Sequence, residues 1–176
     1  TSVVGVSMGG MIAQYLAIDF PEFMEKLVLA VTLARPNDTV KERCETWIKS
    51  AEDKDYEAIM KDCALYSYSD EYLRKNKMML NVISKIGAPK SFDRFITFSK
   101  ACTTHNAYEK LEKITCPTLV IGGMQDKIVT YEASEEIASK IPNAKLKTYE
   151  KFGHAAYEEG KDFNTAVYAF CMGNET

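Results

Sequence analysis

The sequence predicts an α/β protein, with a parallel sheet of about four strands flanked by helices and an all-helical insertion. Two short apolar runs, Ser2–Val6 and 26–31, enclose a helix-like segment, and a strand, helix and strand in succession favour a right-handed parallel crossover. Strand character is absent over residues 36–108 and returns after them. We therefore expect one core built from residues 1–35 and 109–176, interrupted by a helical insertion.

The bulk composition indicates a globular protein that binds neither nucleic acid nor membrane. A chain of 176 residues with 46% hydrophobic content can bury one good core. The net charge is −3, with lysine and arginine scattered among acidic residues, so no basic surface for nucleic acid or anionic lipid is predicted. No apolar run approaches the ~20 residues of a membrane span, and no charged leader precedes an apolar segment. We expect a soluble, cytoplasmic protein.

The cysteines suggest neither a disulfide framework nor a zinc site. They are odd in number and widely spaced, and no C-x-x-C pair occurs among them: Cys44, Cys63, Cys102, Cys116 and Cys171. Reduced, mostly buried thiols are expected, and no metal or organic cofactor.

The first elements all look buried. The run Ser2–Val6 is continuously apolar, as in a parallel strand covered on both faces. Residues 8–20 form a helix with apolar residues nearly all round, which Pro21 ends. Residues 26–31 are a second buried strand.

Four helical segments are predicted in the insertion. Asn37 or Asp38, Asp55 and Ser69 can cap helix starts, and Pro89 suits a first helical turn. The insertion is long for a crossover, which is typical of a functional lid. Its aromatic residues could line an apolar pocket, but most are expected to pack within the helices: Trp47, Tyr56, Tyr66, Tyr68, Phe92, Phe95 and Phe98.

The last third of the chain returns to alternating strands and helices. Residues 117–123 read as a buried strand, and Thr130 can cap the helix that follows. Residues 145–149 alternate as a half-exposed edge strand would. A final amphipathic helix turns Phe163, Val167 and Phe170 inward.

The stretch around Ser7 carries the clearest chemical signal. Gly5 and Gly9 flank Ser7 in a G-x-S-x-G pattern between a strand and a helix, which forces the serine into a sharp, strained turn where side chains two residues away would collide. The backbone N–H of Met8 is then free at the helix start to stabilise an oxyanion. The alternative is an ordinary tight turn.

A nucleophilic serine needs a neutral histidine and an orienting carboxylate. His154 directly follows the last predicted strand, whereas His105 lies at the exit of the insertion and is expected to be structural. Asp126 comes just past a buried strand that ends in Gly-Gly; the alternative for Asp126 is an Asx turn or helix cap. Loops after parallel strands share one sheet edge, so together Ser7, Asp126 and His154 favour a catalytic triad.

At this point the chain resembles the α/β-hydrolase family over nearly its whole length. The resemblance rests on the stretch 5–10, on 116–123 with Asp126, and on 153–155; Ser, Asp, His is also that family's chain order. By resemblance, Ser7 is the nucleophile, His154 the general base and then acid, and Asp126 its orienting carboxylate. The helical insertion looks like the family's cap domain.

One departure from the family concerns the start of the chain. In the family roughly half of the sheet precedes the elbow, and an early loop there supplies a second oxyanion donor. Nothing corresponding occurs here, so an apolar edge beside Ser2–Val6 would be exposed, and such edges pair with other chains. We expect the 176 residues to be the C-terminal part of a longer hydrolase, or one of two chains that assemble, including as a homo-oligomer.

The sequence therefore predicts a serine hydrolase that acts on a small, apolar ester, thioester or related acyl substrate through an acyl-enzyme. By itself the chain should be weakly active or inactive, because it lacks the second oxyanion donor. Acyl transfer, peracid formation and carbon–carbon bond hydrolysis use the same triad and stay open. From another class, a non-catalytic binding module or inactive fragment also stays open.

Overall fold

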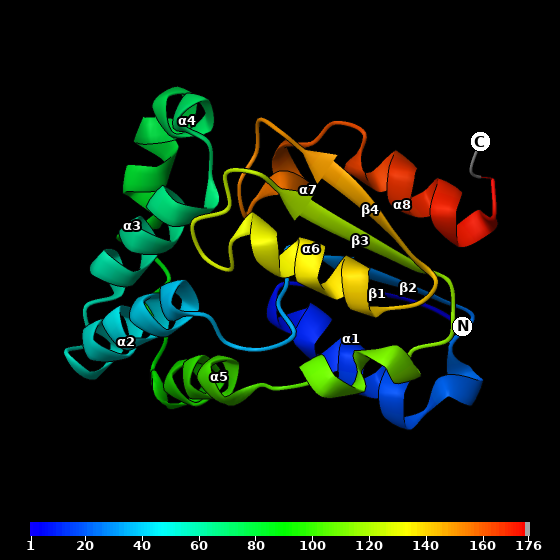
Figure 1. The fold of residues 1–176 in the computed structure, drawn as a ribbon. Coiled ribbons are helices and arrows are strands. Elements are labelled where there is room, and N and C mark those ends of the chain that lie inside the picture. Colours follow the sequence, from blue (N-terminus) through cyan, green and yellow to red (C-terminus); the bar gives the residue numbers. More distant parts are fainter. Residues whose placement is uncertain (175–176) are drawn as a thin grey trace.

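One parallel sheet forms the centre of the molecule. The computed structural model describes residues 1–174. Within them the sheet has four strands in the order β1-β2-β3-β4, all parallel (Figure 1). The strands are β1 (Ser2–Val6), β2 (Lys26–Ala30), β3 (Thr118–Gly123) and β4 (Ala144–Tyr149). This architecture confirms the predicted fold class.

Helices cover both faces of the sheet. On one face lie α1 (Met8–Asp19) and α6 (Tyr131–Lys140), and on the other lie the short α7 (Ala156–Glu159) and α8 (Phe163–Met172) (Figure 1). Alternate residues of each buried strand point to opposite faces, so β2 and β3 supply both cores. The first core gathers Ala13, Leu29, Val120 and Ile137, and the second gathers Val28, Ile121, Phe163 and Phe170.

The parallel register brings the loops of interest to one edge. Gly5 pairs with Leu29, Ala30 with Ile121 and Gly123 with Tyr149, so the strands end close together. Beyond this edge lie the helices that connect β2 to β3 (Figure 1). They are α2 (Asp38–Glu52), α3 (Tyr56–Ser67), α4 (Asp70–Ile83) and α5 (Asp93–Thr104), and we call them the cap. Two short 3₁₀ helices, η1 (Pro21–Phe23) and η2 (Tyr108–Lys113), complete the fold.

Three of the predicted helix caps are confirmed. Side-chain oxygens of Asn37, Asp55 and Ser69 accept backbone N–H groups at the starts of α2, α3 and α4. The prediction for Pro89 is wrong, because α5 begins only at Asp93. Thr130 occupies the cap position of α6 but makes no side-chain cap, since its backbone is held at a φ of 68°.

Two expectations of burial are wrong. β1 is an edge strand rather than a strand covered on both faces, and Val4 is 46% exposed. Only one face of α1 packs on the sheet, so Ile12, Leu16 and Phe20 on its other side are exposed. The physical reason is the same for both elements: within the described residues, no further strand or helix lies beyond β1.

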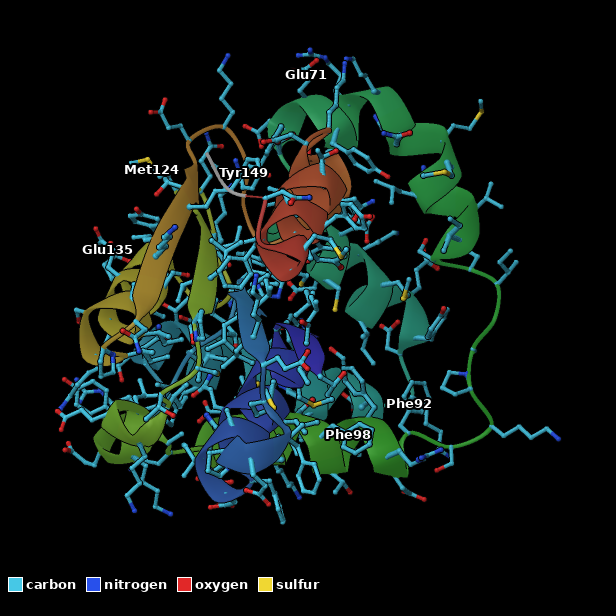
Figure 2. The ribbon with its side chains drawn as sticks, turned by 90° about the vertical axis from the view of Figure 1, so that its right-hand side faces the viewer. Glu71, Phe92, Phe98, Met124, Glu135 and Tyr149 are labelled. Atoms are coloured by element: carbon cyan, nitrogen blue, oxygen red, sulfur yellow. The ribbon has the colours of Figure 1, made fainter. Side chains whose placement is uncertain are left out.

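The cap is held together mainly by α2 and its neighbours. Cys44 of α2 is buried against Leu33 and Val40, with Cys102 of α5 packed beside them. The Trp47 indole N–H donates to Asp62 across α2 and α3 at 2.6 Å. By contrast, α4 buries none of its residues. Figure 2 shows α4, marked by Glu71, well away from Phe92 and Phe98 at the α5 end of the cap.

The helices and the cysteines show two further features. Among residues 1–174, no helix combines the length and the apolar character needed to cross a membrane. All five cysteines are free thiols.

Candidate active site

Ser7 occupies a strained turn between β1 and α1. Its backbone has φ 52° and ψ −122°, a conformation that residues with a side chain rarely adopt. The Ser7 N–H donates to the Ala30 carbonyl at 2.9 Å, and the Thr32 hydroxyl donates to the Ser7 carbonyl at 2.7 Å. Neighbouring β2 and the segment after it therefore hold the turn in place.

The two glycines of the motif are not equivalent. A Cβ atom at Gly5 would lie 2.6 Å from the Gly9 carbonyl oxygen and 2.7 Å from Gly10 Cα, both on the backbone of α1. A Cβ atom at Gly9 would meet nothing within 4 Å. The expected steric role thus holds for Gly5 and fails for Gly9 in this chain, while Gly10 makes the second close approach, to Thr32.

This difference predicts opposite effects of two identical substitutions. Gly5→Ala should lower the free energy of unfolding by about 3 kcal/mol, because backbone atoms cannot give way to the new methyl group. Gly9→Ala, the matched control, should leave it unchanged or raise it by about 0.5 kcal/mol, because alanine favours a helix over glycine. Urea unfolding of both variants measures this, and equal destabilisation would contradict the geometry.

His154 lies in a tight loop after β4, pressed against the end of β3. A Cβ atom at Gly123 would lie 2.4 Å from the Gly153 carbonyl oxygen, and one at Gly153 would lie 2.8 Å from the Gln125 carbonyl oxygen. Only glycines allow the two backbones to approach so closely. As a result the His154 loop sits directly beside the loop that carries Asp126.

Asp126 uses its two carboxylate oxygens for different purposes. Oδ1 accepts the N–H groups of Ile128 at 2.8 Å and Val129 at 3.0 Å, which is the local turn expected of an aspartate after a strand. Oδ2 lies 2.8 Å from Nδ1 of His154. The predicted turn is therefore present and fixes the carboxylate, while the second oxygen faces the imidazole.

The three side chains form one hydrogen-bonded chain. Nε2 of His154 lies 2.8 Å from Oγ of Ser7, and the side chains of His154 and Asp126 are 9% and 1% exposed. An ionised carboxylate only accepts, so Nδ1 carries the hydrogen and donates to Asp126. In the neutral ring Nε2 then accepts the hydroxyl hydrogen of Ser7. A hydroxyl held in this way can pass its proton to the imidazole as it attacks a carbonyl carbon.

Met8 supplies a free donor next to the serine. It begins α1, so its N–H has no partner within the helix. In the described part of the chain it also donates to no carbonyl outside the helix. A substrate oxygen beside Ser7 could therefore accept this N–H.

His105, the other histidine, lies elsewhere in a structural setting. It is buried, with Nε2 3.4 Å from the Gln14 side-chain oxygen and its ring edge-on to Tyr15. Burial lowers the pKa of His105, which favours the neutral ring. The structural interpretation of His105 is confirmed.

The contact between the cap and the His154 loop was not anticipated from the sequence. The N–H of Ala155 donates to the Ser67 carbonyl at 2.8 Å, and Ser69 bonds to Glu159. These partners stand about 90 residues apart and belong to no recognisable motif. No signal in a single sequence pairs them.

The cap also carries apolar hollows, and its helices hold no metal-binding cluster. A groove of about 550 Å³ between α3 and α4 is lined by apolar residues and three cations: Met60, Lys61, Ala64, Leu65, Leu73, Arg74, Lys77, Leu80 and Asn81. A second hollow, of about 380 Å³, includes Tyr68 and Tyr72.

Over residues 1–174, no three His, Cys, Asp or Glu side chains gather as metal ligands would.

The chain matches one protein family over most of its length. Residues 1–161 match the family described as serine aminopeptidase, S33. A solved structure of similar fold is MGS-M2, an α/β-hydrolase enzyme from a Medee basin deep-sea metagenome library. It superimposes with a TM-score of 0.87 at 25% identity, covering 100% of this chain and 66% of that one.

Two curated relatives are similar over nearly the whole chain. A Caulobacter sp. (strain K31) protein, provisionally named carbamate hydrolase RutD, is 29% identical over 174 residues. The 3-oxoadipate enol-lactonase 2 of Acinetobacter baylyi is 25% identical over 168 residues. The matches cover 97% and 94% of this chain, but the chain spans only 65% and 61% of the relatives' own lengths.

Proposed function

Because the chain belongs to the serine aminopeptidase S33 family of α/β-hydrolases, we propose that Ser7, His154 and Asp126 act together as the catalytic triad of a serine hydrolase. The observation that carries the proposal is the continuous hydrogen-bonded chain from Ser7 Oγ through His154 to Asp126, with 2.8 Å at each link. The proposed substrate is an ester, a thioester or a related acyl compound.

In the first half of the reaction, Ser7 Oγ attacks the substrate carbonyl carbon while Nε2 of His154 takes the hydroxyl proton. The negative charge that develops on the carbonyl oxygen is stabilised by the N–H of Met8. Asp126 stabilises the doubly protonated imidazole through Nδ1–H. His154 then gives its proton to the departing alcohol or thiol, which leaves the acyl group on Ser7.

In the second half, water replaces the departed group. Nε2 of His154 takes a proton from this water as its oxygen attacks the acyl-enzyme carbonyl. The carbon–oxygen bond to Ser7 breaks, His154 returns the proton to Ser7 Oγ, and the acid is released. The proton exchanged between Ser7 and His154 thus moves over one hydrogen bond that the resting side chains already form.

The proposed substrate class has two kinds of support. The relatives' names refer to a carbamate and an enol-lactone, and both contain a carbonyl carbon bonded to a heteroatom that can leave. The groove between α3 and α4 presents mainly apolar side chains, including Leu65, Leu73 and Leu80. An apolar acyl portion suits such surfaces.

We further propose that additional polypeptide, from a longer protein or a second chain, covers the β1 edge. Val4, Ile12 and Phe20 are 46%, 63% and 50% exposed there, and an apolar edge of this kind favours pairing. The same polypeptide would supply a second oxyanion donor. Since one such donor is worth roughly 10²- to 10³-fold in turnover, the chain alone should be a feeble catalyst.

Trapping the acyl group tests the proposed function. Incubation with p-nitrophenyl butyrate should release p-nitrophenolate and add one butyryl group to the peptide that contains Ser7, as read by intact-mass and peptide mass spectrometry. Detecting the adduct does not require fast turnover, so the test suits a feeble catalyst. His154→Ala should form no adduct. A folded wild-type chain that never becomes acylated would count against the proposal and favour a non-catalytic binding module.

A further inference from the structure

The turn between α3 and α4 touches the loop that carries His154. The carbonyl of Ser67, the last residue of α3, accepts the N–H of Ala155 at 2.8 Å, and Ala155 directly follows His154. A Cβ atom at Gly153 would lie 3.3 Å from the same carbonyl oxygen. The backbone on both sides of His154 therefore lies against the cap.

The carboxylate of Glu159 fastens this turn to the core. Glu159 ends α7, five residues after His154, and its Oε1 accepts the backbone N–H of Ser69 at 3.0 Å. Its Oε2 accepts the Ser69 hydroxyl at 2.5 Å. The same hydroxyl oxygen accepts the N–H of Tyr72 and so caps α4. Glu159 thus holds the start of α4 through two bonds, where the helix dipole favours a negative charge.

The neighbouring Glu158 plays a lesser part. Its Oε2 accepts one hydrogen bond, from the Tyr68 hydroxyl at 2.6 Å, and its side chain is exposed. Glu159 is half-buried and accepts two bonds, one of them from the backbone. Hydrogen bonds to a charged group strengthen as water is excluded, so Glu159 is the stronger link.

We propose that Glu159 is a positioning residue for His154, acting through the cap turn 67–69. By holding Ser69, Glu159 keeps the Ser67 carbonyl within reach of the Ala155 N–H. That bond in turn keeps the imidazole of His154 in line between Ser7 and Asp126. The role given to His154 rests on the proposed function, whereas the link from Glu159 to the His154 loop stands on the hydrogen bonds alone.

The arrangement couples the cap to the catalytic chemistry. If the start of α4 moves away from α7, the Ser67 carbonyl leaves the Ala155 N–H and the His154 loop loses its support on that side. A ring displaced by even 1 Å is expected to cost roughly 100-fold in rate. When the cap is packed against the core, it would hold His154 in its catalytic position, as closed lids do for catalytic groups in other enzymes.

Three variants test the link. Glu159→Ala removes both acceptors, whereas Glu159→Gln keeps an oxygen for the Ser69 N–H and an amide that can donate to the Ser69 hydroxyl. Glu135→Ala is the matched control, because Glu135 is an exposed glutamate of α6 on the side of the molecule away from α4 (Figure 2). Two quantities are measured on each: hydrogen–deuterium exchange of peptides covering 66–70 and 152–157, and the rate at which a fluorophosphonate labels Ser7.

Glu159→Ala should raise exchange in both peptides together and slow the labelling of Ser7 by about 10- to 100-fold. Glu159→Gln should return both the exchange and the labelling rate most of the way to the wild-type values, which would not be expected if the substitutions simply unfolded the chain. Glu135→Ala should match the wild type. Combining Glu159→Ala with Ser69→Ala should add little to the labelling defect, since both act through one contact.

Two results separate the possible failures. If Glu159→Ala raises exchange only in the cap peptide, with wild-type labelling, then the positioning role is overturned. If the wild type itself does not label, the proposed function fails. In that case the exchange measurement still tests the link. If Glu159→Ala raises exchange in both peptides, Glu159 holds the His154 loop; if it raises exchange only in the cap peptide, it does not.

Discussion

Ser7→Ala is expected to lower turnover of an ester substrate by roughly 10⁶-fold. Loss of the nucleophile has an effect of this size in serine hydrolases, because the serine and the histidine act as a unit. Alanine removes the hydroxyl oxygen that lies 2.8 Å from Nε2 of His154, so no acyl-enzyme can form. The fold should survive, because alanine places no larger side chain at the strained turn than serine does. Turnover at saturating substrate tests the loss of activity, and a thermal melt followed by circular dichroism tests the survival of the fold.

The matched control for this variant is Ser139→Ala. Ser139 is an exposed serine of α6 whose hydroxyl bonds only within its own helix, to the Glu136 carbonyl. Its loss should leave turnover at the wild-type value. Should Ser7→Ala keep turnover within tenfold of the wild type while remaining folded, Ser7 would not be the nucleophile.

Asp126→Asn is expected to lower turnover by roughly 10⁴-fold while leaving the fold intact. The amide oxygen can still accept the N–H groups of Ile128 and Val129, so the turn after β3 should persist. The amide nitrogen, however, would face Nδ1 of His154 and donate to it. The ring would then carry its hydrogen on Nε2, where it cannot take the proton of Ser7.

This variant separates the two uses of Asp126. If the carboxylate served only the turn, asparagine would replace it with little effect on turnover. Asp55→Asn is the control, because Asp55 caps α3 with one oxygen and asparagine caps helices equally well. That control should keep wild-type turnover and stability, whereas wild-type turnover in Asp126→Asn would remove Asp126 from the proposed triad.

Much of the core fold could be predicted from local patterns. Continuous apolar runs gave β2 and β3, alternation gave the edge strand β4, and the strand–helix–strand order required parallel pairing. Parallel pairing alone then predicted that the loops after β1, β3 and β4 meet at one edge. For this reason Ser7, Asp126 and His154 could be grouped without knowledge of any distance.

Features that depend on distant neighbours could not be predicted. The apolar character of β1 and α1 suggested full burial, but a strand's own residues do not say whether a further strand lies beside it. The motif likewise did not reveal that Gly5, and not Gly9, meets the backbone of α1. The contact of Glu159 with the cap turn joins residues far apart in sequence, so only the folded chain shows it.

Labelling with a fluorophosphonate tests the central claim most directly, because this probe reacts with a serine only when a neighbouring base activates it. We predict one adduct per chain, located on Ser7 by peptide mass spectrometry, and none in Ser7→Ala or His154→Ala. A folded chain that forms no adduct would contradict the assignment of Ser7, His154 and Asp126 as a working triad.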